Sequence, residues 1–336
     1  MNVIIPLAGR GTRLRPLTYA KPKPMVYVGG KPVLGHIIDR VKKVNPDKWV
    51  FVYSHGLEEI QGYLNQEYSD LNMVFVKQEE MRGDGHALQL AKSEIDIASP
   101  VLVDFSDTIF DEHALDNLQD LNSADAYVWV KKVEDYKRFG ILTYDDQNKV
   151  SAWYEKPENP VGDRAWIGLA YFPSGKTLFE FLDKVVEIER TSKGNEIRLA
   201  DAFAQMLDEK KYLYAIDTKE WLDCGTISNL LETNKELLDK KECQQVPEQS
   251  IQKSVVIPPV FISKSAKIRN AIVGPYVSVA KGAVIKGTVV KYSIIDQDAY
   301  IENMTLEKSL IGKNALIRDN IRRLNVSDHS EIDFEH

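Results

Sequence analysis

A basic, glycine-rich segment lies close to the N-terminus. The apolar stretch Val3–Pro6 is followed directly by Leu7-Ala8-Gly9-Arg10-Gly11-Thr12-Arg13. Glycines let a backbone approach a polyphosphate closely, and consecutive N–H groups can surround an anion. The planar guanidinium of Arg13 suits the outer phosphates of a nucleotide. The loop lacks both the third glycine of a dinucleotide fingerprint and the Gly-Lys-Ser/Thr ending of a Walker A loop, so it predicts a phosphate site of another kind.

A second basic motif, Lys21-Pro22-Lys23-Pro24-Met25, follows this loop. Two prolines hold the chain extended and limit the directions in which Lys23 can point. A fixed ammonium beside a phosphate loop suits an α-phosphate under nucleophilic attack. The alternative is a solvated basic loop, which is the usual environment of lysine.

Two aspartates follow apolar stretches in distant parts of the chain. Asp107 comes directly after Val101–Ser106, and Asp223 lies in Trp221-Leu222-Asp223-Cys224-Gly225-Thr226. Mg²⁺ prefers hard oxygen ligands and is typically held by one or two carboxylates together with substrate phosphates. The fold must therefore bring these aspartates together if they bind a metal; otherwise each is a turn residue or a helix cap. Asp104 is a weaker metal candidate because it lies inside the predicted strand.

A glutamine precedes two closely spaced glycines in Gln78-Glu79-Glu80-Met81-Arg82-Gly83-Asp84-Gly85-His86-Ala87. The glutamine amide offers an acceptor and paired donors, which suits the edge of a nucleobase. Gly83 and Gly85 permit close approach of the backbone. We expect His86 to pack against or cap its helix.

The elements that position these residues alternate between strands and helices in the first part of the chain. The predicted strands are 3–7, 50–53, 73–76 and 100–105, and the predicted helices are 34–44, 58–67 and 85–91. This alternation predicts a mainly parallel sheet covered by helices on both faces. Ligands of such sheets bind at the carboxyl ends of the strands, here after Leu7, Val76 and Phe105.

The pattern changes from Trp129 to Phe172, where predicted strands dominate. Strands are predicted at 127–132, 140–144, 150–155 and 166–172, and helices at 178–189, 198–208 and 227–243. Residues 244–255 are polar and are interpreted as a linker. Aliphatic residues then recur at steps of five or six, as Ile262, Ile268, Val273, Val279, Ile285, Val290, Ile295, Ile301, Leu306, Ile311 and Ile317. This period predicts a β-helix over 256–325, with a tail at 326–336, although a run of antiparallel strands is the alternative.

Composition excludes several classes of protein. The net charge of the 336-residue chain is −7, which argues against broad nucleic-acid binding. The chain has only two cysteines, Cys224 and Cys243, which fits a reducing cytosol better than a disulfide framework. No stretch resembles a signal peptide or a membrane span, so we expect a cytoplasmic protein.

Together, the motifs resemble those of the sugar-1-phosphate nucleotidyltransferases over roughly residues 1–235. The resemblance rests on Gly-x-Gly-Thr-Arg-Leu-x-Pro-Leu-Thr, on Lys-Pro-Lys-Pro-Met, on the Gln78 segment and on Glu155-Lys156-Pro157. Many members also carry a C-terminal left-handed β-helix, which the repeat matches. The resemblance implies an α/β fold with a Rossmann-like, mainly parallel sheet between helices over 1–243, followed by a left-handed parallel β-helix.

The resemblance also implies site residues. Arg13 and Lys23 would be the catalytic phosphate-binding pair, and Asp107 and Asp223 the Mg²⁺ ligands. Nucleotide binding would involve Leu7, Ala8, Gly9, Gly11, Thr12, Gln78, Gly83 and Asp84, and sugar phosphate binding Gly140, Glu155, Lys156 and Gly168. Two positions depart from the family pattern: Ser106 stands where the family has glycine, and Asp84 where relatives often have threonine or another small residue.

The predicted reaction joins a nucleoside triphosphate to a sugar 1-phosphate and releases pyrophosphate. Gln78 favours UTP or dTTP, and glucose 1-phosphate is the family's commonest acceptor; a mannose-1-phosphate guanylyltransferase is the alternative. An acyltransferase site in the β-helix would need a histidine base, but no histidine falls within residues 250–320. A catalytically silent regulatory homologue is disfavoured by the intact basic and acidic motifs. We expect a homo-oligomer that binds neither nucleic acid nor membranes.

Overall fold

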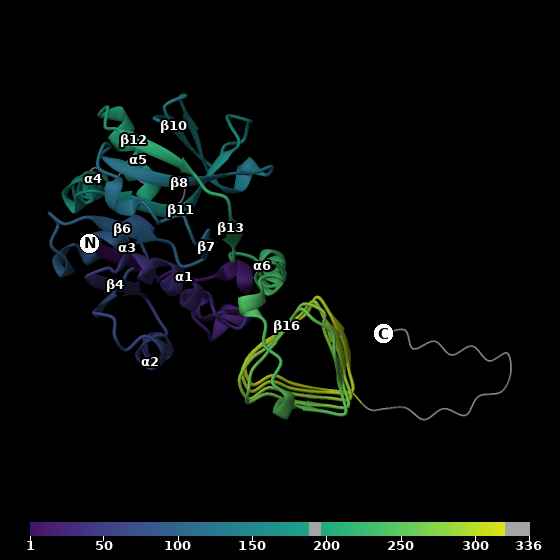
Figure 1. Ribbon diagram of the computed structural model, residues 1–336. Helices are drawn as coiled ribbons and strands as arrows, with labels where there is room; N and C mark the ends of the chain where they lie inside the picture. Colours follow the sequence, from purple (N-terminus) through teal and green to yellow (C-terminus); the bar gives the residue numbers. More distant parts are fainter. Residues whose placement is uncertain (188–195, 320–336) are drawn as a thin grey trace, which may run out of the picture. The chain divides into compact units, whose positions relative to one another are not determined.

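The computed structural model describes residues 1–187 and 196–319, and it divides into two compact units (Figure 1). The first unit is Met1–Thr233 and the second begins at Asn234. The division falls inside helix α6 (Ile227–Asp239). It thus lies before the predicted domain boundary at residue 243, because the second half of α6 groups with the segment that follows it.

The first unit is built on a nine-stranded sheet. Four neighbouring strands are parallel: β1 (Asn2–Pro6), β4 (Lys48–Tyr53), β5 (Met73–Lys77) and β6 (Val101–Asp104), with β1 between β4 and β6. The strands β8 (Ala126–Lys132), β9 (Gly140–Tyr144), β10 (Val150–Glu155), β11 (Arg164–Phe172) and β12 (Leu213–Asp217) extend it. The predicted parallel strands thus form one part of the sheet, and β11, which runs antiparallel to β6, β8 and β9, extends it as a mixed sheet.

Helices separate many of the strands along the first unit. They are α1 (Val33–Val41), α2 (Leu57–Glu67), α3 (Asp84–Leu90), α4 (Gly175–Glu187) and α5 (Leu199–Asp208). Residues 188–189 of the helix predicted at 178–189 lie outside the described residues. Leu88 of α3, Phe179 of α4 and Phe203 of α5 share one core with Ile4 and Val103 of the sheet. Alternate residues of a strand point to opposite faces, so this core covers one face of the sheet.

Several short strands have no counterpart in the predicted elements. The most important are β7 (Thr108–Phe110) and β13 (Trp221–Asp223), which pair antiparallel as a separate two-stranded sheet. A second small hairpin joins β2 (Tyr27–Val28) and β3 (Lys31–Pro32). Strands of two or three residues are too short to show a period in the sequence.

The second unit is the predicted parallel β-helix. Three sheets enclose a triangular cross-section (Figure 1). They contain β14 (Ile251–Gln252), β17 (Lys267–Arg269), β20 (Val284–Lys286), β23 (Tyr300–Glu302) and β26 (Leu316–Arg318); β15 (Val255–Val256), β18 (Ile272–Val273), β21 (Val289–Lys291) and β24 (Thr305–Glu307); and β16 (Val260–Ile262), β19 (Val277–Val279), β22 (Ile294–Ile295) and β25 (Leu310–Ile311). The predicted left-handed parallel β-helix fold is confirmed.

The aliphatic repeat forms the interior of this unit. Ile268, Ile285 and Ile301 pair in successive coils, and Val273 pairs with Val290 in the next sheet. These side chains are fully buried in one core. Ile251 and Val255 already pair with Ile268 and Ile272, so the β-helix begins inside the segment predicted as a linker. Residues 320–325 of the predicted β-helix and the tail at 326–336 lie outside the described residues.

Two further features of the described residues bear on the protein's class. Neither Cys224 nor Cys243 forms a disulfide among the described residues. Within residues 1–187 and 196–319, none of the helices combines the length and apolar character needed to cross a membrane.

Candidate active site

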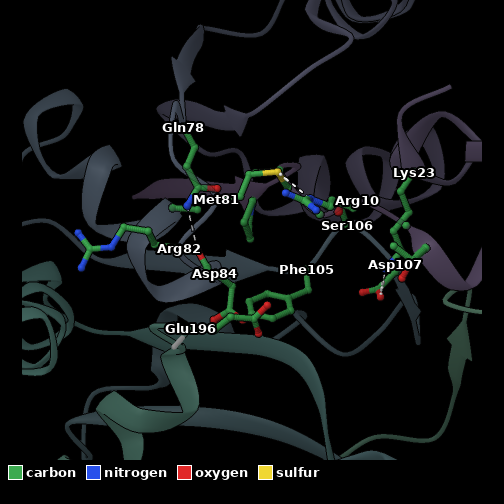
Figure 2. A pocket seen from close by; sticks show the side chains of 17 residues that line it. Arg10, Lys23, Gln78, Met81, Arg82, Asp84, Phe105, Ser106, Asp107 and Glu196 are labelled. Carbon is green, nitrogen blue, oxygen red and sulfur yellow. Dashed lines mark hydrogen bonds and ion pairs between the residues drawn. The ribbon is translucent and has the colours of Figure 1, made fainter. Parts of the chain in front are cut away.

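A cavity of about 700 Å³ opens at the carboxyl ends of β1, β5 and β6. It is lined by Pro6, Ala8, Gly9, Arg10, Gly11, Thr12, Lys23, Gln78, Met81, Arg82, Gly83, Asp84, Ala87, Phe105, Ser106, Asp107 and Glu196. Figure 2 shows Lys23 and Asp107 at one end of the cavity and Gln78 and Arg82 at the other. The loops after these three strands are the places where the sequence predicts the ligand.

The glycine-rich loop turns sharply at Gly11, whose φ of 60° lies in the left-handed region. The Gly11 carbonyl accepts hydrogen bonds from the Leu14 N–H (2.9 Å) and the Thr18 hydroxyl (2.7 Å). A Cβ at position 11 would approach Cβ of Lys23 to 3.1 Å. Gly11 therefore lets the loop lie directly against Lys23. Leu7 is buried and does not line the cavity, whereas the other residues of the segment predicted to bind nucleotide, Ala8, Gly9, Gly11 and Thr12, do line it.

Lys23 begins a short 3₁₀ turn (Lys23–Met25) after Pro22. Pro22 packs over Gly56, where a Cβ would come within 2.1 Å of the proline ring. The ammonium of Lys23 forms an ion pair with Asp107 Oδ2, and the two side chains are only 15% and 24% exposed. The prolines thus place a half-buried cation where the sequence predicts one.

The charge on Asp107 is stabilised by this environment. Burial alone would raise its pKa, but the Lys23 ammonium and the Arg13 guanidinium outweigh burial and hold the pKa of Asp107 below its ordinary value. A carboxylate stabilised by two cations is ionised at neutral pH.

The β7–β13 ribbon brings the two distant aspartates together. Asp223 pairs with Thr108 across the ribbon, and the Cys224 N–H donates to the Asp107 carbonyl at 2.9 Å. The Asp223 carboxylate accepts from the Gly225 N–H at 2.7 Å and from the Asn229 amide at 2.5 Å. The two predicted metal ligands are therefore neighbours, with Asp223 at the end of β13 and Asp107 directly before β7.

Arg13 lies beside the same ribbon. A Cβ on Gly225 would be 3.2 Å from Arg13 Nη2 and 2.8 Å from Asp223 Oδ1, so the glycine makes room for both groups. Arg13 is exposed and, like Asp223, is outside the set of residues that line the cavity. The structure therefore gathers Arg13, Lys23, Asp107 and Asp223 at one end of the cavity, with Lys23 and Asp107 in its wall.

The paired aspartates fit the chemistry of a Mg²⁺ site. Their side chains are 24% and 17% exposed, so carboxylate oxygens reach solvent from a half-buried position. In the described parts of the chain, no group of three or more His, Cys, Asp or Glu residues could hold a metal ion. Two carboxylates suit an ion that takes its remaining oxygen ligands from water and phosphate.

At the other end of the cavity, Gln78 and Gly83 are bonded to each other. The Gln78 amide nitrogen donates to the Gly83 carbonyl at 3.0 Å. Gly83 has a φ of 102°, and a Cβ there would lie 2.3 Å from the Ile197 carbonyl oxygen. Asp84 accepts a hydrogen bond from the Leu199 N–H at 2.7 Å, and burial raises its pKa to about 6. All three predicted residues line the cavity, and Asp84 also anchors the start of α5.

The predicted sugar-phosphate residues adjoin the cavity without lining it. Gly140 pairs with Glu155 across β9 and β10, and the Lys156 ammonium is 3.3 Å from the Glu155 carboxylate. Gly168, with a φ of 89°, lies at an irregularity in β11, and a Cβ there would be 3.0 Å from Phe105 Cβ. Gly168 thus lies against Phe105 in the cavity wall. The Lys156 ammonium lies beside Glu155 and is not part of the group formed by Arg13, Lys23, Asp107 and Asp223.

Several residues near the site escaped the sequence-based selection. Arg138 lies 3.7 Å from Asp223 Oδ2, and the adjacent Phe139-Gly140 motif was the available signal for it. Arg198 connects Glu155 (3.4 Å) to Glu196 (3.1 Å), which lines the cavity. The Arg10 guanidinium lies 3.4 Å from the Met81 sulfur (Figure 2). The position of Arg10 between two loop glycines was the signal in the sequence that could have identified it.

Comparisons with known proteins bear on the family of the chain. Residues 2–240 match the family described as nucleotidyl transferase. The chain is 35% identical over 240 residues to the bifunctional protein GlmU of Methanocaldococcus jannaschii, covering 71% of this chain and 55% of the relative. It is 28% identical over 367 residues to the low-salt glycan biosynthesis nucleotidyltransferase Agl11 of Haloferax volcanii, covering 99% of both chains.

A solved structure supports the fold of the first unit. An apo UDP-glucose pyrophosphorylase superimposes with a TM-score of 0.63 at 20% identity, covering 71% of this chain and 98% of the other. The chain spans only about 55% of the length of the GlmU relatives that it matches. From the family match over most of the chain, and from the motifs gathered around the cavity, we conclude that this chain belongs to the nucleotidyl transferase family, among the sugar-1-phosphate nucleotidyltransferases.

Proposed function

We propose that the protein transfers a nucleotidyl group from UTP or dTTP to glucose 1-phosphate, releasing pyrophosphate and forming a nucleotide-sugar. One observation carries the proposal. Lys23, Arg13 and the paired Asp107 and Asp223 meet at one end of a cavity whose other end holds Gln78 and Gly83. A nucleotide with its base beside Gln78 and its phosphates beside Lys23 spans this cavity.

The residues suit an in-line displacement at the α-phosphorus. A phosphate oxygen of the sugar 1-phosphate attacks, and pyrophosphate leaves, so the protein needs to supply position and charge rather than a covalent nucleophile. Lys23 is held against Asp107 and would reorient toward the α-phosphate, while Arg13 and the loop N–H groups would bind the outer phosphates. Asp107 and Asp223 would hold Mg²⁺, which when bound neutralises phosphate charge.

The acceptor sugar is assigned to the pocket around Glu155. The Glu155 carboxylate suits sugar hydroxyl groups, and the Lys156 ammonium beside it suits the sugar phosphate. A glucose-1-phosphate thymidylyltransferase of Streptomyces griseus is 23% identical over 98% of both chains, which supports glucose 1-phosphate as the acceptor. The second candidate is a guanylyltransferase using mannose 1-phosphate, because guanine also places an N–H beside a carbonyl.

A matrix of substrates tests the proposal. The full-length protein with MgCl₂ is assayed for pyrophosphate release with UTP, dTTP, GTP, CTP and ATP, each combined with glucose, N-acetylglucosamine and mannose 1-phosphates. We expect the highest kcat/KM with UTP or dTTP and glucose 1-phosphate. GTP with mannose 1-phosphate as the best pair would select the second candidate, and no release from any pair would refute a nucleotidyltransferase activity.

Two accompanying expectations have separate tests. Light scattering during size-exclusion chromatography measures the mass and checks for the expected homo-oligomer. None of the described β-helix residues is a histidine, which disfavours an acyltransferase site there. An assay with acetyl-coenzyme A and amino-sugar phosphates checks for this activity.

A further inference from the structure

The side chain of Gln78 is held by two neighbours rather than one. Its amide nitrogen lies 3.0 Å from the Gly83 carbonyl oxygen and 3.1 Å from Nδ1 of His86, which is on α3. Gln78 is only 3% exposed, yet it lines the cavity (Figure 2). This small network lies at the end of the cavity opposite Lys23.

Hydrogen-bonding chemistry fixes the orientation of this amide. A backbone carbonyl can only accept, so the Gln78 atom facing Gly83 must be the NH₂ group. The same nitrogen faces His86 Nδ1, so Nδ1 must also accept and the imidazole proton must reside on Nε2. Both amide hydrogens are then used within the protein. Among the described residues, the Gln78 oxygen has no partner, and it is the hydrogen-bonding atom left for a ligand.

We propose that His86 is a positioning residue that keeps the Gln78 carbonyl oxygen turned toward the nucleobase, and thereby selects bases that present a ring N–H. The inference rests on the proposed function and adds a determinant of its specificity. Uracil and thymine carry this donor at N3, and guanine carries it at N1. Cytosine and adenine present a lone pair at the corresponding ring nitrogen. That nitrogen and the Gln78 carbonyl oxygen are both acceptors, so they cannot form a hydrogen bond with each other.

The network requires His86 to be neutral. Burial, followed by the positive charge of Arg82, lowers the pKa of His86 from its ordinary value, while the Glu80 backbone and carboxylate act in the opposite direction. Protonation would place an N–H on Nδ1, facing the two donors of the Gln78 amide. The amide could relieve this conflict only by turning its oxygen toward His86, which would direct that oxygen against the Gly83 carbonyl as well.

Nucleotide binding by the full-length protein tests the role of His86. Titration calorimetry gives the Kd of UTP and of CTP, which have rings of the same size. His86→Leu removes the acceptor and should narrow the CTP/UTP ratio of Kd values by roughly 3- to 10-fold, the contribution of one hydrogen bond. His86→Asn retains an acceptor without a titrating group and should keep most of the ratio. His113→Leu, at an exposed histidine that does not line the cavity, is the control.

The pH dependence gives a second readout that a purely structural role would not change. In the wild type, the ratio should narrow as pH falls below 6.5, the ordinary pKa of histidine, and it should not do so in His86→Asn. Asp84 also titrates near pH 6, but it is present in both proteins and cancels in this comparison. Thermal unfolding of each variant checks that the fold is retained.

The outcomes separate this inference from the proposed function. A wild type that binds CTP as tightly as UTP would overturn it, as would a Leu variant with an unchanged ratio or an Asn variant that behaves like Leu. Selective, His86-dependent binding of UTP without pyrophosphate release would refute the proposed function alone. Absence of any nucleotide binding would overturn both.

Discussion

Replacing Lys23 by methionine separates the charge of this residue from its packing. The methionine side chain retains most of the apolar stem but removes the ammonium that pairs with Asp107. Pro22, which packs over Gly56, still fixes the backbone on its N-terminal side. The substitution therefore removes one cation from the phosphate end of the cavity and leaves the loop in place.

The expected loss of stability is small. Breaking a fully buried ion pair costs about 3–5 kcal/mol, but here the two side chains are 15% and 24% exposed, and Arg13 still acts on Asp107. We therefore expect the free energy of unfolding to fall by about 1–2 kcal/mol. In a unit of this size, that loss lowers Tm by about 2–8 °C.

The expected loss of activity is much larger. Removing one preorganised donor to a transition state typically lowers kcat by about 10²–10³, equivalent to roughly 3–4 kcal/mol. The assay is pyrophosphate release with the best substrate pair, at a temperature where circular dichroism shows the variant to be folded. Lys42→Met is the matched control, because Lys42 also pairs with an aspartate (2.7 Å) but both side chains are more exposed, at 43% and 62%.

The comparison of the two variants decides the role of Lys23. A Lys23→Met protein that is folded and retains more than half of the wild-type rate would exclude a role in stabilising the transition state. An equal loss of activity in Lys42→Met would show that the effect comes from a general loss of stability.

Three further predictions concern other features. Asp223→Asn keeps a hydrogen-bonding group but loses the charge, so the Mg²⁺ concentration for half-maximal rate should rise at least about tenfold; Asp217→Asn, at an exposed carboxylate paired with Arg164, should leave the Mg²⁺ titration unchanged. Burial, reinforced by the charge of Asp107, raises the pKa of Asp104, so its native state holds a proton that the unfolded chain releases above pH 4. The free energy of unfolding should therefore fall with rising pH by up to about 1.4 kcal/mol per unit in this window, and urea titrations of Asp104→Asn should lack that slope. Gly83→Ala forces a strained φ and a clash with the Ile197 carbonyl, so it should lose about 1–3 kcal/mol of stability in urea unfolding, whereas Gly62→Ala, in open space on α2, should gain about 0.5–1 kcal/mol.

Features of the fold that depend on local sequence patterns were predictable from the sequence. The strand β1 and helix α3 follow from apolar runs and from the glycines that begin the helix. The β-helix follows from regularly spaced aliphatic residues such as Ile268, Ile285 and Ile301. Each of them is buried against its counterpart in the next coil, which lies nearby in the sequence. These signals are local, so a single sequence contains them.

Features that depend on distant pairing were not predictable. Nothing local indicates that β7 and β13 pair, although that pairing makes Asp107 and Asp223 neighbours. The antiparallel return of β11 beside β6 also joins segments far apart in the chain, and no local pattern indicates which strand it would pair with. His86 was expected to pack or cap, but α3 has no side-chain cap, and its imidazole bonds instead to Gln78. Each of these contacts depends on how segments far apart in the chain meet.

The β7–β13 ribbon also sets an order of events during biosynthesis. The ribosome adds residues from the N-terminus, and Asp223 is among the last residues of the first unit to be made. The glycine-rich loop, Gln78 and Asp107 are all synthesised earlier. A nascent chain can therefore assemble its parallel core long before its second aspartate emerges, and the two aspartates become neighbours only when nearly the whole first unit has left the ribosome.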